Sequence, residues 1–313
     1  MFRWMVRLKL VPRRHYCFIF HRLLAERDEL MPGIPTVQEF EAQLLQIKQH
    51  FRVIPMVDTL TTALDNRPTA SISFDDGYAD NLHLLAPLLR KHQAHATVFC
   101  TTAFLKGDLM WNDWLIEFVR QSPPGLMDLS EFDLGIYDLP VAIEKRRSTL
   151  KHLLMTVKYW PSEQRIAFIH FVRTQVPNPP RLMLNENEMR SFDRQTLHIG
   201  GHTHDHHVLT TTSSNEARWQ IEHNRGVLTD ILGEAPRLFA FPNGKPETDY
   251  RREHLHMIRK AGYEAAWTTE NGAWDNQTDR YQIPRFTPWR WSMLHFTKDL
   301  AQISRREPLL LKA

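Results

Sequence analysis

The segment ASISFDDGY, residues 70–78, leads from a short strand-forming run into a tight turn that holds two carboxylates. Residues 70–74 predict a strand, and Asp75, Asp76 and Gly77 follow it directly. The glycine permits the sharp turn that this strand end needs. Two adjacent carboxylates cannot point at the same spot, so one can bind a cation while its neighbour reaches a water bound to that cation. Taken alone, however, Asp-Asp-Gly is also ordinary turn chemistry.

Strand-like and helix-like segments alternate on both sides of this turn. We expect one helix to begin at Thr36, which forms a capping box with Glu39, and another to be capped by Asn215 and to end at Gly233. Alternation of this kind implies a parallel sheet or barrel with helices outside it. The expected strands are residues 16–21, 52–56, 70–74, 96–101, 197–199, 238–241 and 265–268, and the expected helices are 36–51, 81–92, 216–232 and 250–261.

Residues 105–185 interrupt the alternation and have helical patterns. Trp111, Trp114, Leu115 and Phe118 recur at the spacing of one helix face, and further helices are expected at 143–159 and 163–172. We interpret residues 1–313 as one catalytic domain with a helical insertion at 105–185. The insertion either covers a substrate groove or packs on the flank of the barrel, and the sequence leaves both roles open.

The composition is that of an ordinary globular protein. Hydrophobic residues make up 42% of the chain, and the formal net charge of +3 is too small to indicate a nucleic-acid surface. Cys17 and Cys100 are the only cysteines, so a disulfide framework is not expected. No signal peptide or membrane span is apparent, which predicts a cytoplasmic protein. Basic and apolar residues mix over 3–14, a pattern that fits either peripheral contact with the inner membrane surface or a solvated terminus.

A histidine-rich segment, GGHTHDHH, occupies residues 200–207. His202 and His206 are four residues apart, so in a strand or a helix their side chains share a face and can converge on one ion. Two imidazoles and a carboxylate, with one position open to water, suit a catalytic Zn²⁺ or a similar divalent metal. The alternative is a solvated polar loop, and the roles of His204 and His207 stay open.

Three segments together resemble motifs of the polysaccharide deacetylase family, which is characterised by its NodB homology domain. They are SFDDGYADN at 73–81, HTHDH at 202–206 and LFAFPNG at 238–244, in the order and spacing of the family. The flanking segments HATVF, residues 95–99, and KAGYEAAWTT, residues 260–269, agree as well. The resemblance implies a deformed (β/α) barrel with a metal at the carboxyl ends of its strands.

The resemblance also implies roles for individual residues. Asp76, His202 and His206 would bind one divalent ion, with Zn²⁺ as the first choice and Co²⁺, Ni²⁺ or Mn²⁺ as alternatives. Asp75 would be the general base, and a backbone N–H near Pro242 and Asn243 would stabilise the oxyanion. The implied substrate is an oligo- or polysaccharide with N-acetylhexosamine units, in surface-polysaccharide biosynthesis.

Two departures from the family pattern concern the proton donor and an arginine. Ala240 stands where many members carry an arginine that pairs with the catalytic aspartate. The late Leu-x-His motif is also missing, because MLH at 293–295 lies in an expected amphipathic helix. In one branch of the family the motifs are rearranged, and a strand of hydrophobic residues followed by a histidine lies near the N-terminus. The segment FIFHR, residues 18–22, is similar to that strand. His21 is therefore the predicted general acid, and His295 is the second choice. Arg285 of IPRF is the candidate for the missing arginine, and the alternative is an ordinary surface arginine.

Two other function classes remain open at this point. A metal-dependent phosphoesterase or amidohydrolase could use the same ligands, but a second ion would usually require more of them. A non-catalytic carbohydrate-binding protein could retain the barrel. Asp75 argues against a pure binder, which needs no general base, whereas the missing motif arginine argues for one.

Overall fold

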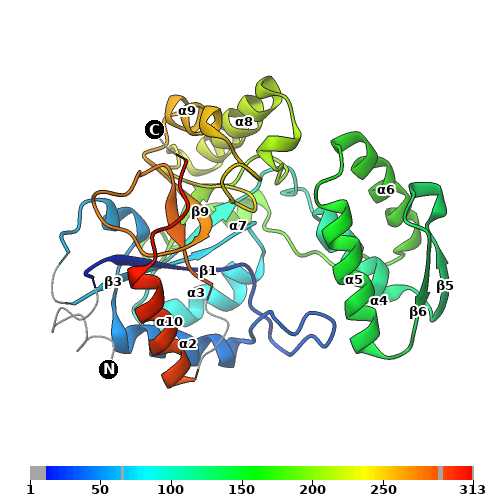
Figure 1. Cartoon of the computed structure of the whole chain (residues 1–313), viewed down its shortest axis with the longest axis horizontal. Coiled ribbons are helices and arrows are strands. Elements are labelled where there is room, and N and C mark those ends of the chain that lie inside the picture. The colour runs from blue at the N-terminus through cyan, green and yellow to red at the C-terminus, as the bar shows by residue number, and fades with distance from the viewer. Residues whose placement is uncertain (1–11, 65–66, 288–291, 312–313) are drawn as a thin grey trace.

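Residues 12–64, 67–287 and 292–311 are described by the computed structural model (Figure 1). Eight strands form one sheet in the order β1-β3-β4-β7-β8-β9-β10, with β2 also paired to β3, and every pair of neighbours is parallel. The strands are β1 (His15–Phe20), β2 (Arg52–Val53), β3 (Thr69–Phe74), β4 (Ala96–Cys100), β7 (Leu197–Gly201), β8 (Leu238–Ala240), β9 (Ala265–Asn271) and β10 (Ile283–Arg285).

The last strand returns to the first and nearly closes the sheet. Directly after β10, the Phe286 N–H donates to the Cys17 carbonyl at 2.7 Å, and the Ile19 N–H donates to the Phe286 carbonyl at 3.1 Å. This single parallel bridge joins the two ends of the strand order. The predicted deformed (β/α) barrel is therefore confirmed.

Helices cover the outside of this barrel, as the alternating pattern predicted. Thr36 and Glu39 form the expected capping box. The cap of the longest helix is Ser213 and not Asn215, because the Ser213 hydroxyl accepts the Glu216 N–H at 3.3 Å; Gly233 ends that helix in a left-handed conformation, as expected. The helices outside the insertion are α2 (Val37–His50), the π turn η2 (Asn81–Leu85), α3 (Ala86–Lys91), α7 (Glu186–Arg190), α8 (Ser214–Leu232), α9 (Arg252–Ala261) and α10 (Met293–Arg305), with 3₁₀ turns η1 (Met56–Leu60) and η4 (Leu209–Thr211).

The strand expected at 52–56 is reduced to the two residues of β2. Pro55 cannot donate a backbone hydrogen bond to the neighbouring strand, and it precedes the 3₁₀ turn η1.

Aromatic side chains fill the space between the sheet and the helices beside it. Phe20 of β1 packs edge-on against Phe40 of α2 and stacks on Phe74 of β3 at 5.4 Å between ring centroids.

The insertion forms a lobe beside the barrel, shown in green at the right of Figure 1. It contains α4 (Trp111–Gln121), α5 (Ile143–Val157) and α6 (Ser162–Gln175), near the expected helical stretches. It also contains an antiparallel hairpin of β5 (Gly125–Asp128) and β6 (Ile136–Leu139), with the 3₁₀ turn η3 (Ser130–Phe132) between them, so it differs from the purely helical insertion that we expected. The hairpin reverses through Asp133 and Gly135, both with left-handed backbones.

The loop between β1 and α2 connects the barrel with this lobe. Leu30 is 3% exposed and belongs to the hydrophobic cluster of the insertion rather than to that of the barrel. Just before it in the chain, Asp28 pairs with Arg120 of α4 at 2.6 Å, and the Glu29 carbonyl accepts a hydrogen bond from the Arg147 side chain of α5 at 2.6 Å. The insertion is therefore fastened to the residues that directly follow the first strand.

None of the described helices is both long enough and apolar enough to cross a bilayer. Residues 3–11, the larger part of the basic terminal stretch, lie outside the described residues. Contact of this stretch with a membrane stays a prediction.

Candidate active site

The predicted site residues gather at the carboxyl ends of the barrel strands. Asp75 and Asp76 follow β3, and His202 follows β7. His206 lies on the loop between β7 and α8. Because every neighbouring pair in the sheet is parallel, these strand ends share one rim, where ligands of parallel sheets usually bind.

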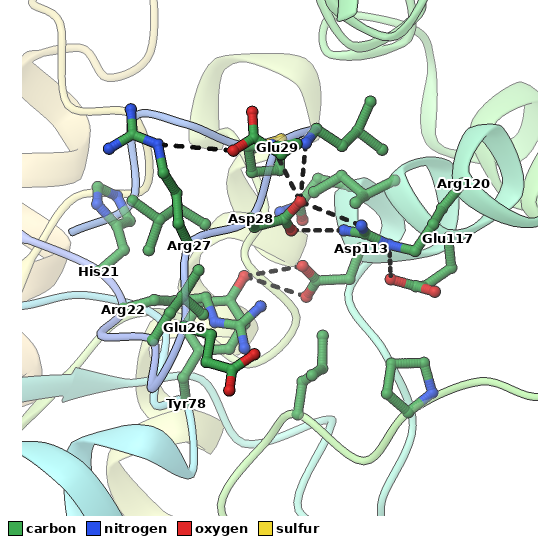
Figure 2. Close-up of a pocket in the computed structure, with 18 of the residues that line it drawn as sticks. His21, Arg22, Glu26, Arg27, Asp28, Glu29, Tyr78, Asp113, Glu117 and Arg120 are labelled. Carbon is green, nitrogen blue, oxygen red and sulfur yellow. Dashed lines mark hydrogen bonds and ion pairs between the residues drawn. The ribbon is translucent and has the colours of Figure 1, made fainter. Parts of the chain in front are cut away.

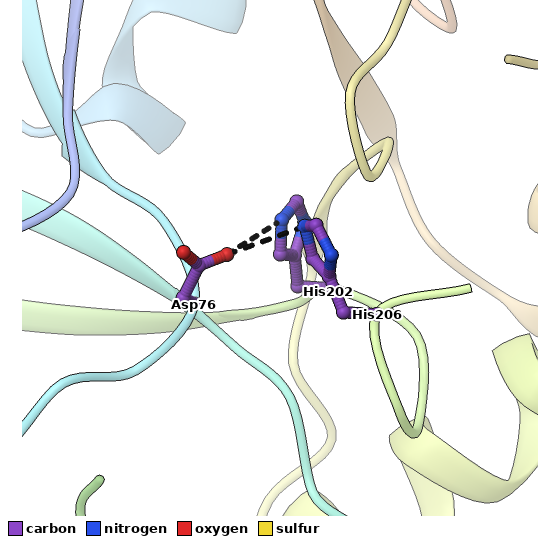
Figure 3. A group of neighbouring side chains, drawn as sticks. All are labelled: Asp76, His202 and His206. Carbon is purple, nitrogen blue, oxygen red and sulfur yellow. Dashed lines mark ion pairs between the residues drawn. The ribbon is translucent and has the colours of Figure 1, made fainter. Parts of the chain in front are cut away.

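Asp76, His202 and His206 form the cluster shown in Figure 3, where both imidazole rings face the same carboxylate. Their potential ligand atoms all lie within 4.8 Å of one another. The Nε2 atoms of His202 and His206 are each 3.4 Å from Asp76 Oδ1. That oxygen is buried and has no hydrogen-bond partner, an unfavourable state that a cation would relieve.

The surroundings of the two histidines suit metal binding. His202 Nδ1 lies 2.8 Å from the Ala240 carbonyl, which can only accept, so this nitrogen donates and Nε2, on the side of Asp76, is the atom that can face a metal. Burial lowers the pKa of His206 to about 4, so its ring is neutral at physiological pH. A carboxylate and two imidazoles are a fitting donor set for a divalent ion of the zinc type.

Unusual backbone conformations hold this cluster in place. Asp76 has φ 79° and His206 has φ 62°, so two of the three potential ligands are non-glycine residues in the left-handed region. Such a conformation costs on the order of 1–3 kcal/mol and persists where the surroundings impose it. Asn224 of α8 supplies part of that support: its side chain donates to the Thr203 carbonyl at 2.7 Å and accepts the His202 N–H at 3.3 Å.

The paired glycines before His202 allow close packing of β7. A Cβ on Gly200 would lie 2.5 Å from ring carbons of Phe99, and a Cβ on Gly201 would overlap the Tyr263 hydroxyl. Only glycine therefore fits where β7 brings the histidine loop against its neighbours.

Asp75 is held by Arg285 in a bidentate pair. The guanidinium Nη1 and Nη2 lie 2.6 and 2.8 Å from the two carboxylate oxygens. Arg285 is fully buried, so it is not the surface arginine that the sequence left as an alternative. Its Nε donates to the Thr268 carbonyl at 2.9 Å, and its Nη1 also reaches the Ser73 hydroxyl at 3.2 Å.

The pair keeps Asp75 ionised. Burial alone would raise the pKa of this carboxyl, but the Arg285 guanidinium, with a smaller contribution from His202, outweighs burial and lowers the pKa below its ordinary value. Asp75 also lies close to the histidine cluster, since its Oδ2 is 4.0 Å from His202 Nε2.

His21 directly follows β1, and its exposed side chain lines two neighbouring cavities. The larger, about 870 Å³, is also lined by Asp76, and Figure 2 shows part of its wall. The smaller, about 510 Å³, extends toward Thr269 and Thr287. His295, the second choice for the acid, lies on α10, is exposed and contacts Ser292 at 2.6 Å; it lines neither cavity.

The third motif places Pro242 and Asn243 after β8. Asn243 has φ 60°, and its carbonyl accepts the Thr269 hydroxyl. Within the described part of the chain, the Asn243 N–H has no hydrogen-bond partner, so it remains available to a ligand.

The other two histidines of the segment at 200–207 are engaged elsewhere. His204 bonds through Nδ1 to the Thr102 hydroxyl at 2.9 Å and packs against the rings of Trp219 and His223. His207 pairs with Asp205 at 2.5 Å. Neither belongs to the Asp76 cluster.

Comparison with known proteins identifies the family. A family model described as polysaccharide deacetylase matches residues 64–122 and 157–266, so it omits the hairpin and most of α5 in the insertion. No curated protein matches the chain.

Several solved structures share the fold. The Streptococcus pyogenes deacetylase PplD in complex with acetate has a TM-score of 0.61 at 14% identity, covering 94% of this chain and 100% of that chain. IcaB from Ammonifex degensii has a TM-score of 0.56 at 14% identity, covering 92% and 97%. A de-N-acetylase from Aggregatibacter actinomycetemcomitans has a TM-score of 0.57 at 13% identity, covering 91% and 99%. At such identities the likeness concerns the fold alone, whereas the family model spans more than half of the chain. The chain therefore belongs to the polysaccharide deacetylase family.

Proposed function

We propose that this chain is a metal-dependent carbohydrate N-deacetylase, which hydrolyses the acetamide of N-acetylhexosamine units in an oligo- or polysaccharide. The observation that carries the proposal is the arrangement of Asp75. Its carboxylate is ionised and fixed by Arg285, and it lies beside a three-residue ligand cluster without belonging to it. A general base needs this placement, because a base must be near the activated water but free to accept its proton.

In this mechanism Asp76, His202 and His206 would hold a divalent ion, and the ion would polarise the acetamide carbonyl and lower the pKa of a bound water. Asp75 accepts the proton of the attacking water as its oxygen bonds to the carbonyl carbon. The Asn243 N–H is free to donate to the developing oxyanion. Protonated His21 then gives its proton to the sugar nitrogen as the carbon–nitrogen bond breaks, which yields acetate and a free amine.

The buried pair argues against a purely binding protein. Moving two charges out of water is costly, and a well-packed apolar pair is often at least as stable as a buried ion pair. Asp75 and Arg285 contribute no atom to the ligand cluster, so metal binding does not require them. A catalytic use of the carboxylate accounts for the presence of this buried pair.

The number of potential ligand groups favours a site for one metal ion, whereas many phosphoesterases bind two. Within the described ranges, the Asp76 cluster is the single group of three or more histidine, cysteine or acidic side chains close enough to share a metal. A role in surface-polysaccharide biosynthesis and a cytoplasmic location stay predictions from the sequence.

Removing His206 should abolish metal binding. We expect the parent chain to retain about one equivalent of Zn²⁺ after dialysis, and His206→Ala to bind it at least ~100-fold more weakly, because one of three protein ligands is lost. His204→Ala is the matched control, because His204 packs against Trp219 and His223 and not against the ligand cluster. This variant should bind zinc as tightly as the parent. Metal analysis and calorimetric titration measure both. Loss of zinc in the control and retention in His206→Ala would contradict the ligand set.

Asp75→Asn should separate metal binding from catalysis. The amide keeps the size of the side chain but cannot take a proton, so acetate release from N-acetylated chito-oligosaccharides should fall by ~10²–10⁴ while zinc content stays at the parent level. Acetate is measured with an enzyme-coupled assay on zinc-loaded protein. A fully active Asp75→Asn variant would disprove the proposed base.

Arg285→Gln should destabilise the protein, because it leaves the Asp75 carboxylate buried and unpaired. The expected loss is ~3–5 kcal/mol of unfolding free energy, and the loss should shrink when Asp75→Asn is already present. Urea unfolding of the four proteins measures this coupling. Arg237→Gln provides the comparison: Arg237 also forms a bidentate pair, with Glu264, but at the surface, and its loss should cost at most ~1 kcal/mol. Equal losses for both arginines would contradict a special role of the buried pair.

His21→Ala should slow acetate release without affecting zinc. Loss of the proton donor to the amine is expected to lower kcat by ~10²-fold or more. His295→Ala serves as the control histidine and should match the parent. A parent-like rate for His21→Ala would refute the acid assignment and leave the metal site and Asp75 untouched.

A further inference from the structure

The larger cavity beside the ligand cluster has two walls of different origin. One wall comes from the barrel rim and the loop after β1, including His21, Arg22 and Asp76. The other comes from α4 of the insertion and includes Asn112. Its neighbour Asp113 is labelled in Figure 2. The insertion therefore lines the cavity next to the site, in addition to packing on the flank of the barrel.

Asp113 is an unusual part of this wall because its carboxylate is buried without a cation. It is 2% exposed, and both of its oxygens lie 3.1 Å from the Tyr78 hydroxyl. No ion pair within 4.0 Å involves it among the described residues. The Arg22 guanidinium, which acts on Asp113 electrostatically, is itself paired with Asp80 at 2.9 Å. Burial raises the pKa of Asp113 to about 7.

Two other acidic residues that line the cavity have a cationic partner. Glu117, one turn further along α4, pairs with Arg120 at 2.9 Å, and Asp28 pairs with the same arginine at 2.6 Å. A carboxylate has about four acceptor positions, and the Tyr78 hydroxyl has one proton to give. In its ionised form, Asp113 therefore has most of its acceptor capacity unused.

Asn112 adds a second unsatisfied acceptor to the same wall. Its Oδ1 is buried and has no hydrogen-bond partner, although the residue lines the cavity. Buried acceptors without donors are rare in proteins and call for a ligand or water that supplies the missing hydrogen. Side by side on α4, Asn112 and Asp113 offer acceptors and no cationic donor.

The wall is held in a fixed position relative to the catalytic rim. The Tyr78 hydroxyl, which bonds to Asp113, belongs to the turn that also carries Asp76. On the other side, Asp28 and Leu30 fasten the His21 loop to the insertion. A sugar chain with one unit at the ligand cluster would therefore meet α4 at a defined distance.

We propose that Asn112 and Asp113 of the insertion bind the sugar unit next to the one that is deacetylated, by accepting hydrogen bonds from its hydroxyl or ammonium groups. This inference rests on the proposed function and adds its substrate selectivity. The acceptor-rich wall selects a donor-bearing neighbour, so the enzyme prefers oligosaccharides to single sugars. Asn112 and Asp113 touch substrate outside the reacting acetamide, which makes them specificity residues.

The test compares substrates that can and cannot reach the wall. Acetate release is measured with N-acetylglucosamine and with its tetramer, for the parent, Asn112→Ala and Asp113→Asn. Asp113→Asn still accepts from Tyr78, so it is expected to fold. For the tetramer, each variant should raise KM by about tenfold with little change in kcat, whereas kcat/KM for the single sugar should stay at the parent value. Asp138→Asn, an exposed acid on the hairpin of the same lobe, is the control and should change neither.

Binding measured without turnover keeps the two proposals apart. In the Asp75→Asn background, tetramer affinity should fall by the same factor when either wall residue is changed. Equal effects on both substrates, or none on the tetramer, would overturn the assignment of the wall, while normal acetate release by the parent would leave the proposed function standing. If the parent releases no acetate from either substrate, the proposed function itself fails.

A second substrate identifies the recognised group. The substitution Asp113→Asn is tested with two tetramers, one fully acetylated and one with a free amine next to the acetylated unit. If the wall binds ammonium, the substitution should weaken binding of the free-amine tetramer more than binding of the fully acetylated one. The two losses should be equal if the wall binds hydroxyl groups. A loss of affinity for neither tetramer would contradict both forms of the inference.

Discussion

The pair between Asp75 and Arg285 depends on how the barrel closes. Arg285 is the last residue of β10, and the next residue, Phe286, exchanges two backbone hydrogen bonds with β1. β1 in turn pairs along the whole of β3, at whose end Asp75 lies. The seam of the barrel thus brings together two charges that are 210 residues apart in the sequence. Without this closure the carboxylate would be buried alone, and a buried, unpaired carboxylate would be expected to take up a proton.

The sequence predicted most of the barrel and the ligand cluster, because both depend on local patterns. Strand and helix alternation indicated the parallel architecture, and the spacing of His202 and His206 suggested that they could meet. The resemblance to the family added Asp76 to that pair and gave Asp75 a separate role. The structure brings these residues together, while their chemical roles stay predictions.

The features that the sequence did not predict depend on contacts between distant segments. Asn224 looks like any polar residue of a long helix, yet its amide fixes the histidine loop. Asp113 carries no motif, and its burial against Tyr78 follows from the position of the insertion. The hairpin was missed because its exposed face mixes apolar and acidic side chains, such as Leu126 and Asp138, so no clear hydrophobic pattern marks it. The cap at Ser213 instead of Asn215 is a two-residue shift between equally suitable side chains.

The position of Leu30 has a consequence for how this protein can be divided. The lobe appears in the sequence as one uninterrupted stretch, but its apolar centre includes a side chain from the loop after β1. A transplant of residues 105–185 alone onto another barrel would leave a hole in that centre and would free Asp28 from Arg120. The structural unit is therefore a pair of segments, and a graft of the lobe onto another barrel has to carry the residues that follow His21 as well.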